Sequence, residues 1–155
     1  MRQDWSRLSH MQLGRYAEHL TAMQFVLHGL DVYAAVIDDR GIDFVLRRAD
    51  GHYWDVQVKS VRARNYVFMR KDVFRPRPNL LLALTLFEDG APPEHYLIPA
   101  SRWEKPDAVF VDRDYDGRAS APEYGLNLSR KALQVLEQYR FGHMADAIFG
   151  PEPIG

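Results

Sequence analysis

The chain contains no cysteine, which excludes disulfide bonds and thiolate metal sites. It has no apolar run of membrane-spanning length, and its first residues lack the apolar core of a signal peptide, so we expect a cytoplasmic protein with no membrane partner. The six histidines are scattered and never form a two-histidine zinc motif, which argues against a zinc site. The formal net charge of -1 is too small for a protein that coats nucleic acid indiscriminately.

The composition is that of an ordinary globular protein, with 46% hydrophobic and 26% charged residues in 155. This length predicts one domain over residues 1–155. Apolar periodicity predicts a helix over residues 10–30, and Ser129 is expected to cap a last helix. We expect a turn at 38–41 and an irregular segment at 70–78. The predicted strands are residues 31–37, 42–48, 53–61, 79–87, 95–98 and 108–111.

Polar side chains interrupt two of these strands. Asp43 follows Gly41 and Ile42 in one strand, and Gln57 and Lys59 lie on one face of the next. A two-residue turn at 50–51 would turn Gln57 away from Asp43, whereas a three-residue loop at 49–51 pairs them. We predict the longer loop, with its last residue, Gly51, in the left-handed conformation. Polar atoms beside a core are costly unless they bind something, so an acid, an amide oxygen and an ammonium suggest a divalent metal, a phosphate and a water to be activated.

A basic run follows this pair of strands and contains a single acid, Asp72, while other acids gather at 107–116. Such a run can be a solvated face, but its position next to the candidate site favours contacts with phosphate. We expect Trp54, Tyr66 and Phe68 to fill the core or flank the sheet. The placement of Tyr66, Phe68 and Phe74 beside the basic run leaves a nucleic-acid surface as a minority alternative.

The order of these residues resembles the PD-(D/E)XK nuclease superfamily. The matching positions are Gly14, Ala17 and Glu18 in the first helix, then 41–43, then 57–59. The resemblance implies an α/β fold with a restriction endonuclease-like αβββαβ core, in which helices flank a mixed central sheet. Small members include archaeal Holliday-junction resolvases and homing endonucleases. Ile42 stands at the proline of the motif, and Gln57 stands at the usual acid, as in a D…QxK variant, which predicts weaker metal affinity.

The resemblance implies a metal-dependent nuclease that hydrolyses phosphodiester bonds, and DNA is the substrate that we expect. Asp43, Gln57 and the backbone carbonyl of Val58 would hold Mg²⁺ or Mn²⁺. Glu18 would orient a metal-bound water or help to hold a second ion, and Lys59 would position the attacking water or stabilise the transition state. The expected phosphate contacts are Arg62, Arg64, Arg70, Lys71, Arg75 and Arg77.

Two other functions remain open from the sequence. One is a catalytically inactive module that keeps the nuclease fold and binds nucleic acid, which Gln57 and the modest charge would suit. The other is a protein-interaction module, which an exposed apolar patch would favour. If the protein cuts both strands of a duplex, a homodimer is expected.

Overall fold

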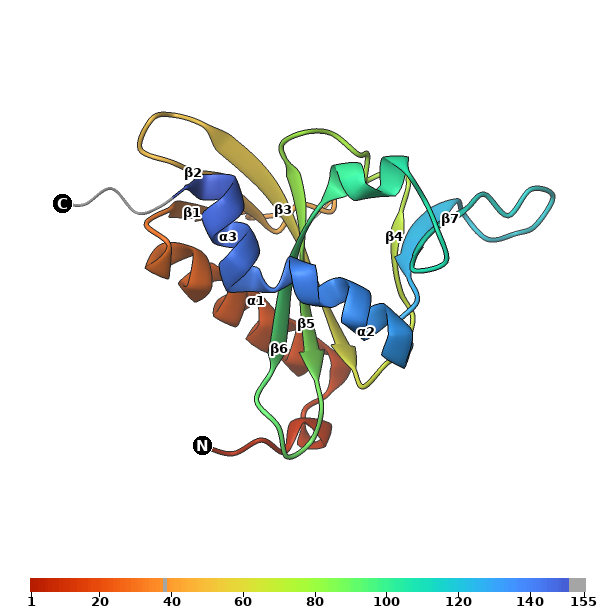
Figure 1. Cartoon of the computed structure of the whole chain (residues 1–155), viewed down its shortest axis with the longest axis horizontal. Coiled ribbons are helices and arrows are strands. Elements are labelled where there is room, and N and C mark those ends of the chain that lie inside the picture. Colours follow the sequence, from red (N-terminus) through yellow and green to blue (C-terminus); the bar gives the residue numbers. More distant parts are fainter. Residues whose placement is uncertain (38, 151–155) are drawn as a thin grey trace.

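A five-stranded mixed sheet forms the centre of the computed structural model, which describes residues 1–37 and 39–150 (Figure 1). Its strand order is β1-β2-β3-β5-β6. Strands β3 and β5 run parallel, and the other neighbouring pairs run antiparallel. The strands are β1 (Asp31–Ala34), β2 (Phe44–Arg47), β3 (Tyr53–Arg62), β5 (Leu80–Phe87) and β6 (Glu94–Pro99).

A second sheet covers one face of the main sheet. Its strands are β4 (Val67–Arg70), β7 (Phe110–Arg113) and β8 (Glu123–Leu126), in the order β4-β8-β7. Val67 and Met69 of β4 pack with Leu82 and Leu84 of β5 in the larger core. The 3₁₀ helix η2 (Ala100–Glu104) and helix α2 (Arg130–Leu136) add apolar side chains to the same core.

Two helices cover the opposite face of the main sheet. Helix α1 (His10–Leu27) begins at a capping box between Ser9 and Gln12, and α3 (Phe141–Phe149) is the last helix described. Phe25 of α1 and two phenylalanines of α3 pack against the main-sheet strands in a second core. Trp5, in the 3₁₀ helix η1 (Trp5–Arg7), packs with Leu13 of α1 in a smaller third cluster. A third 3₁₀ helix, η3 (Glu137–Tyr139), joins α2 to α3.

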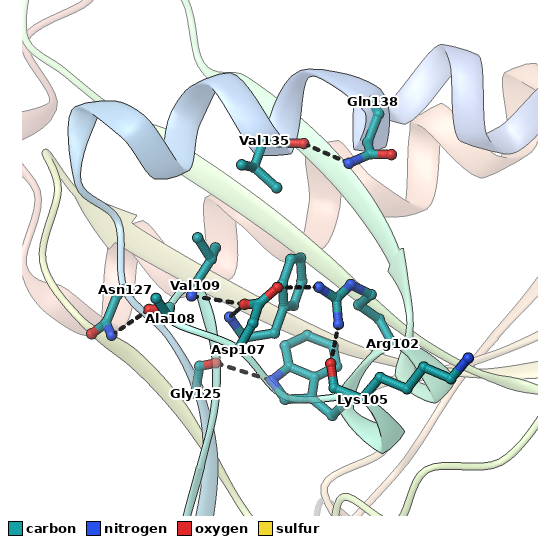
Figure 2. Close-up of polar contacts among 11 residues, drawn as sticks. Arg102, Lys105, Asp107, Ala108, Val109, Gly125, Asn127, Val135 and Gln138 are labelled. Carbon is teal, nitrogen blue, oxygen red and sulfur yellow. Dashed lines mark hydrogen bonds and ion pairs between the residues drawn. The ribbon is translucent and has the colours of Figure 1, made fainter.

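Hydrogen bonds fix the loop that leads into β7, at the corner drawn in Figure 2. The carboxylate of Asp107 accepts a hydrogen bond from the Val109 N–H at 2.8 Å and pairs with Arg102. Burial opposes ionisation of Asp107, but backbone hydrogen bonds and Arg102 hold its pKa below the ordinary value. Trp103 donates from Nε1 to the carbonyl of Gly125 at 2.9 Å, which ties η2 to β8 (Figure 2).

The mixed α/β fold with flanking helices is confirmed, and the expected strands are present with shifted ends. Ser129 caps α2 by accepting a hydrogen bond from the Ala132 N–H at 3.1 Å. Strands β4 and β8 and helix α3 were not predicted. The connection from β3 to β5 contains β4 and no helix, so the chain departs there from the αβββαβ order. Residue 38 of the expected turn lies outside the described residues, and none of the described helices is long and apolar enough to cross a membrane.

Candidate active site

The β2–β3 hairpin sets the position of the candidate site. Phe44 pairs with Val56, and the ladder continues to the turn, where the Arg48 N–H donates to the His52 carbonyl at 2.9 Å. The loop between them therefore has three residues, as predicted. Gly51 has a φ of 91°, a backbone conformation that glycine adopts without the steric cost of a side chain.

The two strands separate at Asp43. Its N–H donates to the Val56 carbonyl at 2.9 Å, and its carboxylate accepts a hydrogen bond from the Val58 N–H at 2.7 Å. These two bonds fall on either side of Gln57, so Asp43 lies alongside Gln57, one step beyond the paired part of the hairpin. Because a strand's N–H groups point in the plane of its sheet, the Asp43 carboxylate lies at the β3 edge that β2 has just left.

Gln57 is the most unusual polar residue near this point. It is only 7% exposed, and its Oε1 has no hydrogen-bond partner among the described residues. Its Nε2 lies close to Gly41, where an added Cβ would be 3.6 Å away. A buried amide oxygen without a partner costs about 1–3 kcal/mol. Amide oxygens are ligands of hard divalent cations, so Gln57 and Asp43 are suited to Mg²⁺ or Mn²⁺.

The described residues contain no group of three or more His, Cys, Asp or Glu side chains placed to hold a metal ion. A metal site here would therefore depend on the glutamine and on a backbone carbonyl as well as on carboxylates. Mg²⁺ sites commonly use one or two carboxylates and complete their coordination with water and substrate phosphate.

Two hollows adjoin along α1, and Asp43 lines the first of them. The first, of about 640 Å³, is lined by Glu18 of α1, by Asp43 and by residues around β1. The second, of about 610 Å³, is lined by Lys59 and by the segment that leads into β4. His10 and Gly14 of α1 line both hollows. No sequence pattern points to His10 as part of this site, because only the docking of α1 on the sheet brings it to this place.

The fold places Glu18 and Lys59 on either side of this junction. Glu18 accepts a hydrogen bond from Arg15 Nη1 at 2.8 Å, and the Arg15 side chain is 78% exposed. Exposed pairs of this kind contribute less than about 1 kcal/mol, so Glu18 can change partner at little cost. Lys59 shares a face of β3 with Gln57, because side chains two residues apart in a strand point the same way.

The basic run is largely occupied by contacts within the protein. Arg62 donates from Nη2 to the carbonyls of Trp5, at 3.0 Å, and of Leu8, so it anchors the amino-terminal segment. Arg77 binds the carboxylate of Asp55 at 2.6 Å. Both guanidinium groups therefore act within the fold.

Two further cations of the basic run also form ion pairs within the fold. Arg70 pairs with Asp72, and Lys71 pairs with Asp112 and, at 2.7 Å, with Asp114. Burial alone would lower the pKa of Lys71, but the two aspartates raise it above the ordinary value. The acids expected to lie apart reach Lys71 because β4 and β7 both flank β8.

Arg64 and Arg75 are the exposed members of the basic run for which the described part of the chain provides no ion pair. The aromatic residues divide in a similar way. Phe74 is fully buried, and Trp54 is 9% exposed in the core under α3, whereas Phe68 is 48% exposed.

No protein-family profile and no curated protein matches the sequence. Solved structures do match the fold. Hjc, a Holliday junction resolvase from the archaeal hyperthermophile Archaeoglobus fulgidus, is 11% identical with a TM-score of 0.54 over 85% of this chain and 94% of that one. A bacterial homing endonuclease is 17% identical with a TM-score of 0.50 over 87% of this chain and 90% of that one. The chain thus has a mixed α/β fold similar to that of a Holliday junction resolvase and of a homing endonuclease.

Proposed function

We propose that this chain is a metal-dependent nuclease that hydrolyses phosphodiester bonds in DNA, working as one domain in the cytoplasm. The observation that carries the proposal is the buried Oε1 of Gln57, which has no hydrogen-bond partner among the described residues, in a residue that lies alongside Asp43. A nuclease-like fold does not require an unsatisfied amide at this point, whereas a bound cation would give the amide oxygen a partner.

Backbone geometry supports Val58 as a further ligand. In a strand, the N–H and C=O of one residue point toward the same neighbouring strand. Because the Val58 N–H donates to Asp43, the Val58 carbonyl also points to the open edge of β3. Asp43, Gln57 and Val58 would hold Mg²⁺ or Mn²⁺, and the bound ion would supply a more acidic water and neutralise charge on the phosphate.

The remaining side chains act on the substrate and the water. Lys59 would hold a non-bridging phosphate oxygen or the attacking water and stabilise the negative charge of the transition state. Glu18, in the hollow shared with Asp43, would accept a hydrogen bond from that water or help to hold a second ion. Arg64 and Arg75 are the strongest candidates for phosphate contacts, since both are exposed and neither forms an ion pair within the described residues.

The direct test is incubation of the purified protein with DNA in Mg²⁺, Mn²⁺ or EDTA. Cleavage is expected only with metal, and Asp43→Ala and Lys59→Met should each abolish it. Asp31→Ala removes an exposed acid of β1 and is the matched control, which should cleave as the wild type does. Thermal unfolding checks that all variants fold, and equal cleavage by the wild type and Asp43→Ala would refute the assignment.

One observation favours protein interaction as a second function. Exposed apolar side chains follow α1 and the edge strand β1, and these two elements are in contact. They include Met11, Met23, Val26 and Leu27 of α1, Tyr33 of β1, and Val36 and Ile37 just after β1. A homodimer formed through this surface would suit a nuclease that cuts both strands, and light scattering after size exclusion would detect it. An inactive binding module would instead retain DNA in a salt-dependent way and never cut it.

A further inference from the structure

An aromatic pair lies on the wall of the hollow that contains Lys59. Tyr66 and Phe68 both line this hollow, which has a volume of about 610 Å³. Side chains alternate along β4, so that Val67 and Met69 are buried and Phe68 points outward with 48% of its surface exposed. The large apolar ring of Phe68 is therefore exposed to solvent in the same hollow as Lys59.

The supporting ring is held rigidly. Tyr66 and Phe68 stack with their ring centroids 6.4 Å apart and their planes 16° from parallel. The Tyr66 hydroxyl donates to Glu123 Oε2 at 2.6 Å, and the Arg113 guanidinium lies 4.5 Å from the centre of the Tyr66 ring. A Cβ on Gly125 would come within 2.0 Å of the Tyr66 hydroxyl, so the absence of a side chain there makes room for the ring.

This arrangement fits a nucleobase better than it fits the hydrophobic core. Phe68 adds little to packing, because nearly half of it is exposed, yet Tyr66 holds it in one orientation. Aromatic rings that bind single-stranded nucleic acid stack on the faces of bases, usually beside cations that contact the backbone. Lys59 lines the same hollow, and the exposed Arg64 lies in the turn just before Tyr66.

We propose that Phe68 stacks on an unpaired base of the substrate strand, next to the phosphate held at Lys59. The proposal rests on the proposed nuclease function and adds a preference for one class of substrate. Bases in a regular duplex are covered on both faces by their neighbours, so only an unstacked base can offer a face to Phe68. The preferred substrates are then single strands and duplexes with a gap, flap or branch, rather than continuous duplexes.

Binding of oligonucleotides that contain 2-aminopurine tests this without cleavage, because the fluorescence of this base falls when it stacks on an aromatic ring. In EDTA, the wild type should quench a single-stranded probe and leave a fully paired probe nearly unchanged. Phe68→Ala should bind the single strand about 5- to 150-fold more weakly and lose the quenching, whereas Phe68→Trp should keep both. Tyr53→Ala is the matched control. Tyr53 is an aromatic residue that is 57% exposed, and it lies at the start of β3, six residues before Lys59.

The outcomes separate this proposal from the nuclease assignment. Metal-dependent cleavage that Asp43→Ala abolishes, together with unchanged binding by Phe68→Ala, would overturn the base site and leave the nuclease. Quenching that depends on Phe68 in a protein that never cleaves would retain the base site and overturn the nuclease. Equal affinity of the wild type for single-stranded and continuous duplex probes would also overturn the proposed preference.

Discussion

Replacing Gln57 with methionine should stabilise the metal-free protein while removing its response to metal. The two side chains have similar length, but methionine carries no polar atom that needs a partner. Gln57 is 7% exposed, and its Oε1 lacks a hydrogen bond among the described residues. In EDTA the wild type therefore bears the cost of a buried, unsatisfied carbonyl, which Gln57→Met avoids.

We expect Gln57→Met to gain about 1–2 kcal/mol in EDTA, which corresponds to roughly 2–8 °C in Tm for a domain of this size. Mn²⁺ at about ten times its Kd should stabilise the wild type by about 1.4 kcal/mol. Gln57→Met should lose most of that gain, so the difference in Tm between the two proteins shrinks as Mn²⁺ is added. Thermal unfolding followed by circular dichroism, across a Mn²⁺ titration, measures both effects.

Thr85 provides the matched control. Its Oγ1 is also buried without a hydrogen-bond partner among the described residues, but Thr85 lies on β5, which β3 separates from β2 and Asp43. Thr85→Val should gain stability in EDTA and keep the full response to Mn²⁺. The reasoning is refuted if Gln57→Met loses stability in EDTA while Thr85→Val gains it, or if the Mn²⁺ response of Gln57→Met is undiminished.

Three further predictions concern the framework of the protein. Gly125→Ala should lower the free energy of unfolding, measured in urea, by about 1–3 kcal/mol, because its Cβ would lie 2.0 Å from the Tyr66 hydroxyl. The double variant with Tyr66→Ala should lose less stability than the sum of the two single changes. Burial lowers the pKa of His95 to about 4. The free energy of unfolding that depends on its neutral form is therefore complete above about pH 6.5 and falls, by up to about 3 kcal/mol, as the pH drops toward 4. His95→Gln should flatten the curve of stability against pH between those two values. Arg62→Met should release the amino-terminal segment and expose Trp5, which a red shift in tryptophan fluorescence would detect. The same change should leave the salt dependence of DNA binding unchanged, and a shallower salt dependence would instead show that Arg62 contacts phosphate.

Local sequence was enough to predict the hairpin at the site. The register of β2 and β3 follows from a three-residue loop that ends in a left-handed glycine, and the prediction was correct as far as Phe44 and Val56. The apolar run at 80–84 also predicts a central strand over 79–87, because it offers apolar side chains to both faces, and the structure has β5 buried along its whole length. The sequence therefore predicted that Asp43 lies alongside Gln57, although it contained no sign of the two adjoining hollows.

The second sheet could not be predicted in the same way. Strand β8 has four residues and contains Gly125, so its extended form depends on its pairing with β4 and β7 rather than on intrinsic preference. Because this sheet was not predicted, the number of basic side chains available for phosphate contacts was overestimated. Lys71 is followed closely in the sequence by other cations, but its nearest charges in the fold are Asp112 and Asp114, brought there by strand pairing.

The connection from β3 to β5 through β4 affects how the protein can be made. Strand β4 has no strand partner until β8 is synthesised, and β5 shares its core with side chains from β8 and α2. A nascent chain that has emerged from the ribosome only as far as β6 therefore covers Leu82 and Leu84 incompletely, because the side chains of η2, β8 and α2 are still missing from their core. Such a chain is open to aggregation or chaperone binding, and the parallel pair at the centre of the protein becomes stable only when synthesis is nearly complete.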